Sequence, residues 1–158
     1  MDAAYAEHYA AVGEKLDQYA AVMLDCLQKR GEFNELHDVA GVNVAPVDGN
    51  AFAIAINVSH VQLRGVFTHA FAQDADEKQL CGVLDFRRVD GKGVPHGDAL
   101  VRVLVDHDGN CGWRGNFDNL HSRVPPGAPE GQYFRRAILQ LLRLQIFEQL
   151  EAHPLGGM

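Results

Sequence analysis

Residues 51–71 read AFAIAINVSHVQLRGVFTHAF, and this stretch decides the fold. Before and after the central Ser59 and His60, large apolar residues recur at every second position. Such alternation is typical of strands that bury one face and expose the other. The stretch therefore predicts two antiparallel strands joined by a tight reversal.

Three more runs with this alternation follow, at residues 80–87, 100–105 and 111–117. The last two are separated by Asp108 and Gly109, a pair that favours a hairpin turn. Residues 32–50 have no sustained period, and we interpret them as a connection that includes one short turn. We expect an antiparallel sheet of about five strands in a meander, over about residues 51–117.

Helical patterns flank the predicted sheet on both sides. Apolar residues recur at intervals of three and four over about residues 2–31 and again over about 130–152. Prolines interrupt residues 124–129, which we interpret as a linker, and residues 155–158 as a disordered tail. The order predicts one α+β domain over residues 1–158, with the long N-terminal and C-terminal helices packed on one face of the sheet.

Charge and composition narrow the class of protein. The net charge is -7, and residues 1–50 hold nine acidic side chains against Lys15, Lys29 and Arg30. This imbalance disfavours nonspecific nucleic-acid binding, which needs a basic surface. No stretch approaches the roughly 20 apolar residues of a membrane span, and no secretory signal pattern is present at the N-terminus. Three cysteines without a close pair favour a reduced compartment, so we expect a cytoplasmic protein.

The sequence contains no pattern typical of a catalytic or metal site. Ser59 and Ser122 lie outside any nucleophile-elbow motif, and the glycine-rich residues 91–97 precede a strand instead of a phosphate-binding helix. The histidines that could share a site are dispersed along the chain, at His69, His96, His107 and His121. Without a recognisable ligand spacing, we assign no catalytic residue, no metal and no cofactor.

One charged surface is predicted from the strand alternation. The positions opposite the apolar set would share the sheet face that the helices leave open, and the charged ones are Arg64, Asp85, Arg87, Arg102 and Arg114. Arginine binds carboxylates through two parallel hydrogen bonds, so this patch is a candidate recognition surface. The alternative is that the arginine stems only cover small neighbours such as Ala53 and pair with Asp85.

Three functions follow from these features. The first is a non-catalytic protein-interaction module, chaperone-like, inhibitor-like or immunity-like, that binds a partner protein through its sheet face or acidic first helix. It could also form a homodimer through either terminal helix. The alternative is a small enzyme or ligand-binding domain with a pocket between sheet and helices, using His69, His96, Asp106 and His121. A nucleic-acid binder ranks third, supported only by arginines of the sheet face and of the last helix.

Overall fold

The computed structural model of the chain describes residues 1–28, 39–74, 77–125 and 130–156. The elements, in chain order, are α1 (Ala3–Gln28), β1 (Val42–Val47), β2 (Asn50–Val58), β3 (Val61–Asp74), β4 (Glu77–Val89), β5 (Pro95–Val105), β6 (Asn110–Gly112), the short 3-10 helix η2 (Phe117–Asn119), β7 (Ser122–Arg123) and α2 (Glu130–Ala152). The predicted α+β class is confirmed. Parts of the expected first helix, linker and tail, at residues 29–31, 126–129 and 157–158, lie outside the described residues.

The strands form a single antiparallel meander in the order β1 to β7. The predicted count of about five strands was too low, because β1 and β7 were missed. β1 lies within residues 32–50, which we expected to be a connection, and it contains Pro46. Proline is tolerated there because β1 is at the edge of the sheet and one side of its backbone needs no strand partner. β7 has only two residues, too few to show a period.

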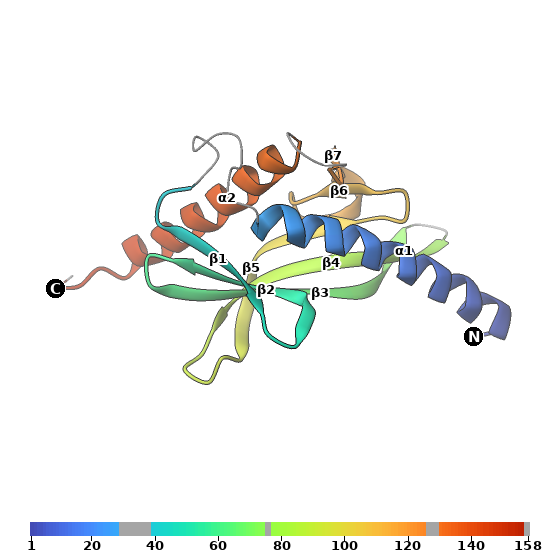
Figure 1. The fold of residues 1–158 in the computed structure, drawn as a ribbon, viewed down its shortest axis with the longest axis horizontal. Coiled ribbons are helices and arrows are strands. Elements are labelled where there is room, and N and C mark those ends of the chain that lie inside the picture. Colours follow the sequence, from blue (N-terminus) through green and yellow to red (C-terminus); the bar gives the residue numbers. More distant parts are fainter. Residues whose placement is uncertain (29–38, 75–76, 126–129, 157–158) are drawn as a thin grey trace.

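Both helices lie over the same face of a curled sheet, and the turn between β4 and β5 projects to the other side (Figure 1). The helix-covered face carries the largest fully buried strand residues, which include Ile54, Ile56, Leu63, Leu84 and Phe86. The helices contribute a matching set that includes Leu16, Met23, Ile138, Leu139 and Leu142. These side chains form one continuous hydrophobic core.

Gly82 shows how tightly this helix-side face is packed. A Cβ atom added at Gly82 would lie 2.4 Å from the ring of Phe67 and 2.7 Å from Val105. No real side chain tolerates such contacts, so the aromatic ring occupies the space that the missing side chain leaves. The neighbouring strands can therefore keep their register while a large ring crosses between them.

Several hydrogen bonds tie the helices to distant parts of the chain, and the following two involve α1. The hydroxyl of Tyr19 on α1 donates to the carbonyl of His107, in the turn between β5 and β6, at 3.2 Å. The buried guanidinium of Arg135 on α2 donates to the carbonyl of Leu27 at 3.1 Å.

Among the described residues, no helix is long and apolar enough to cross a membrane.

Candidate functional site

The face of the sheet opposite the helices is the candidate site, and we call it the far face. The strand registers arrange its side chains in rows that run across β3, β4 and β5. From one end to the other, the rows are Arg64–Arg87, Val66–Asp85–Arg102, Thr68–Val83–Leu104, Ala70–Cys81 and Ala72–Gln79. The far face therefore changes from charged to apolar within two rows.

The charged end brings together four of the five predicted patch residues, and we call Arg64, Asp85, Arg87 and Arg102 the arginine cluster. Arg102 contacts Asp85 through two hydrogen bonds, from Nε to Oδ1 at 2.7 Å and from Nη2 to Oδ2 at 3.1 Å. Arg87 donates to the same Oδ2 at 3.1 Å. The cluster holds one carboxylate and three guanidinium groups, two of which bond that carboxylate, so its net charge is positive.

The cluster also supports the turn between β4 and β5. Arg64 donates to the carbonyl of Gly93 at 3.4 Å, and Arg87 donates to the carbonyl of Gly97. These bonds agree with the alternative interpretation, in which the arginines have structural roles. They do not satisfy the whole cluster, because Nε of Arg64 is buried and finds no hydrogen-bond partner among the described residues. A buried donor without a partner is destabilising by about 1–3 kcal/mol.

Arg114 is not part of the cluster, although it was predicted to be. It was assigned to a strand over residues 111–117, but β6 ends at Gly112. Arg114 is exposed and lines a separate hollow of about 550 Å³, the edge groove, between β5 and α2. Arg87 and Arg102 also line this groove, together with Asp98. Three arginines again outnumber one carboxylate.

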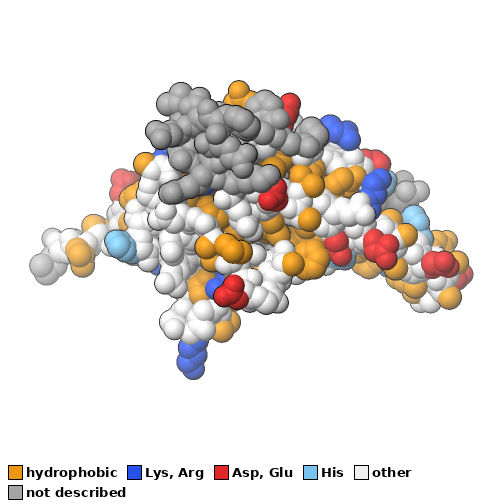
Figure 2. Space-filling model, viewed as in Figure 1, with side chains coloured by type: hydrophobic (Ala, Val, Ile, Leu, Met, Phe, Trp, Pro, Cys, Tyr) orange, Lys and Arg blue, Asp and Glu red, His pale blue; other side chains and the backbone are white. Residues whose placement is uncertain are grey.

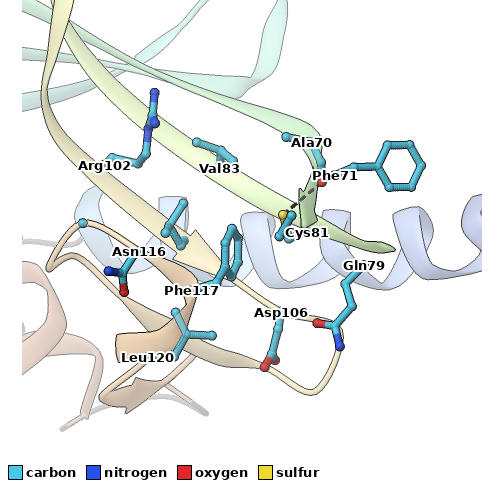
Figure 3. A pocket seen from close by; sticks show the side chains of 13 residues that line it. Ala70, Phe71, Gln79, Cys81, Val83, Arg102, Asp106, Asn116, Phe117 and Leu120 are labelled. Atoms are coloured by element: carbon cyan, nitrogen blue, oxygen red, sulfur yellow. Dashed lines mark hydrogen bonds between the residues drawn. The ribbon is translucent and has the colours of Figure 1, made fainter. Parts of the chain in front are cut away.

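The apolar end of the far face forms the floor of a pocket of about 420 Å³, the Phe117 pocket (Figure 3). Its floor consists of Cys81, Val83 and Leu104, which are 1%, 8% and 4% exposed. Phe117 and Leu120 form the opposite wall. Phe117 was expected to lie in a strand and face the helices. It instead belongs to η2, which follows the end of β6 and lies over the far face.

Arg102 lines both hollows, which makes it the link between the charged and apolar ends. Its side chain is 48% exposed, whereas that of Asp85 is 17% exposed. Within the described part of the chain, Nη1 of Arg102 has no hydrogen-bond partner. The guanidinium can therefore donate to a further carboxylate without releasing Asp85.

The thiols near the site are unsuited to nucleophilic chemistry. Burial raises the pKa of Cys81 to about 11, and its Sγ donates to the carbonyl of Ala70 at 2.9 Å. Burial also raises the pKa of Cys111 to about 11. The thiolate is the reactive form, so at neutral pH both groups are almost entirely in the less reactive thiol form.

The residues proposed for a small enzyme have different neighbours. His69 contacts Asp17 of α1 at 2.8 Å, His96 lies opposite Arg88 in the sheet, and Asp106 accepts hydrogen bonds within its own turn.

The fourth of these residues, His121, lies against Trp113 and lines a hollow of about 460 Å³ near the start of α2. Burial and the nearby Arg114 lower the pKa of this imidazole, and its Nε2 accepts a hydrogen bond from the Trp113 amide at 3.3 Å. The other enzyme candidates do not line this hollow. Within residues 1–28, 39–74, 77–125 and 130–156, no three histidine, cysteine or acidic side chains are grouped as metal ligands.

No protein family, curated protein or solved structure matches this chain. The far face is therefore the feature of this chain from which a function can be inferred.

Proposed function

We propose that this chain is a non-catalytic protein-interaction module that binds a partner protein through the far face of its sheet. The observation that carries the proposal is the arginine cluster beside the Phe117 pocket, on the face that the helices do not cover. Interfaces commonly combine an apolar pocket with arginine, which is enriched among the residues that dominate binding energy.

The distribution of charge also supports this proposal. The net charge of the chain is -7, and acidic side chains line the outer end of α1 (Figure 2). The arginine cluster is a local exception, with three guanidinium groups and one carboxylate. A surface whose charge opposes that of the whole protein steers a complementary partner toward one face.

The test is capture of a partner from the lysate of the native host, followed by mass spectrometry. We expect the charge-reversed double variant Arg64→Glu/Arg102→Glu to lose a partner that the wild-type protein retains. The matched control is Lys15→Glu/Arg136→Glu, which makes the same charge change at two exposed helix positions. Thermal unfolding must show that both variants are folded. An identical set of captured proteins for all three would contradict the proposal.

Self-association through α2 is a second part of the proposal. Leu144, Phe147 and Leu150 are 53%, 47% and 44% exposed, although they lie on a helix that otherwise packs on the core. Apolar side chains grouped in this way favour burial against a second copy. Light scattering should give twice the monomer mass, and Leu144→Lys/Phe147→Lys should return it to the monomer mass. A monomeric wild-type protein would contradict this part.

A further inference from the structure

We infer that the partner contributes a short acidic segment with one large apolar side chain, which fills the Phe117 pocket while a neighbouring carboxylate binds Arg102. This inference rests on the proposed function and specifies the chemistry of its partner. It depends on the register of three strands, which places an arginine and an apolar hollow side by side.

The pocket determines the apolar part of the segment. Its volume of about 420 Å³ lies in the range of roughly 300–1000 Å³ typical of ligand pockets. The floor is formed by Val83 and Leu104 and the wall by Phe117 and Leu120, all of them apolar. Polar side chains also line the pocket, and the one carboxylate among them, that of Asp106, is hydrogen-bonded within its own turn. A large aliphatic or aromatic side chain would remove the apolar surfaces from water, whereas a charged one would lose its hydration.

The arginine cluster determines the acidic part. Arg87 and Arg102 share the carboxylate of Asp85, and among the described residues Nη1 of Arg102 has no hydrogen-bond partner. A partner carboxylate would bring the cluster closer to charge balance. Because Arg102 also lines the edge groove beside Arg114, a second acidic residue of the same segment could be bound there.

Nucleic acid fits this site less well than an acidic peptide. Phosphate backbones are bound by several cations along a continuous track, and their affinity depends on releasing counterions. Here one end of the site is a hollow with an apolar floor and the carboxylate of Asp106 in its lining, and Asp85 already occupies the centre of the cluster. The two partner classes respond differently to loss of Phe117, which provides a way to separate them.

The experiment is selection of random peptides displayed on phage against the immobilised protein. We expect the recovered peptides to combine a large apolar residue with neighbouring aspartate or glutamate. A fluorescein-labelled copy of the most frequent peptide should lose at least about tenfold in affinity with Arg102→Glu and with Phe117→Ala. Arg136→Glu, an exposed change on α2, is the control and should have no effect. Circular dichroism must show that all variants are folded.

The other outcomes separate the inference from the proposed function. Peptides that lack acidic residues, or whose binding neither variant weakens, would overturn the inference and leave a protein partner open. Capture of a lysate partner without any recovered peptide would also overturn it, since a short segment would not suffice. If the protein retained no partner from the lysate and selected no peptide from the phage library, the proposed function would be contradicted as well. Tight binding of a labelled single-stranded DNA, lost with Arg102→Glu but not with Phe117→Ala, would point to nucleic acid instead.

Discussion

The two faces of the sheet are built from the same strands, but they differ in what covers them. On the helix face, α1 and α2 bury Leu84 and Phe86 completely. On the far face, Leu104 is 4% exposed, while the side chain of Arg102, two positions earlier on β5, is 48% exposed. Burial on the helix face is continuous because two long helices span it. On the far face it is local, because the segment that contains Phe117 lies over the apolar end alone.

The largest expected effect is on the helix face, where Leu84→Ala removes a fully buried side chain. We expect the free energy of unfolding to fall by about 2–5 kcal/mol, because the surrounding helices and strands cannot collapse into the cavity. Urea denaturation, followed by circular dichroism, would measure the change. A loss below about 1 kcal/mol would show that this face is not the main core.

The corresponding change on the far face, Leu104→Ala, should have a smaller effect. Leu104 is almost as buried as Leu84, but it borders an open pocket that the Phe117 segment can partly close. We expect a loss of about 2 kcal/mol, measured by the same urea denaturation. An effect equal to that of Leu84→Ala would mean that the far face contains a second rigid core.

Within the arginine cluster, the pair Asp85 and Arg102 should contribute little to stability. Their contact has good geometry, but the arginine is about half exposed and solvent screens the interaction. A double-mutant cycle with Asp85→Asn and Arg102→Gln should give a coupling energy of about 0.2–1 kcal/mol. A coupling well above this range would favour a purely structural role for the cluster.

The smallest effect is a dependence on pH at His121. Burial and Arg114 lower the pKa of this imidazole in the folded state, so the folded protein binds fewer protons than the unfolded chain. The contribution of His121 to the free energy of unfolding is therefore fully present above the ordinary histidine pKa of about 6.5. It decreases as the pH falls from there to the lower pKa of the folded state.

Urea unfolding at pH 7.5 and 5.5 would measure this dependence through the shift of its midpoint. The signal is the fluorescence of Trp113, the only tryptophan in the sequence. The difference between the two midpoints should become smaller in His121→Asn. The same difference in this variant would assign the effect to another group.

Residues 51–71 were predicted well because both strands alternate strictly on either side of the turn. The turn residues Ser59 and His60 have φ angles of 46° and 72°, as a two-residue reversal requires, although neither is the glycine usually found there. Here the phase of the alternation, and not the identity of the turn residues, indicated the hairpin. The C-terminal helix had an equally clear period.

The far face was predicted only in part. Arg64, Asp85, Arg87 and Arg102 follow directly from alternation within long strands, and the structure brings them together. The apolar half of the face was missed, although Leu104 follows Arg102 at the same phase and so gave a signal. A buried apolar residue at a position expected to be polar indicates that something covers the sheet there.

The position of the segment that contains Phe117 could not be predicted from the alternation of apolar residues. Arg114 and Phe117 lie beyond Gly112, where β6 ends, and the alternation of residues 111–117 gave no sign of that end. Gly112 itself closely approaches the backbone of Asn119, where an added Cβ would lie 2.9 Å from its carbonyl oxygen. This tertiary contact, which a local period cannot reveal, accompanies the change in chain direction.

The hydrogen bonds of α1 have a consequence for how the chain is made. The carbonyl that the Tyr19 hydroxyl bonds is synthesised 88 residues later. The guanidinium that bonds the carbonyl of Leu27 is synthesised 108 residues later. At ribosomal rates, the second delay is on the order of ten seconds. Contacts this distant along the chain also slow folding itself. α1 therefore precedes, in the order of synthesis, the residues that complete its surroundings, and it reaches its final environment late.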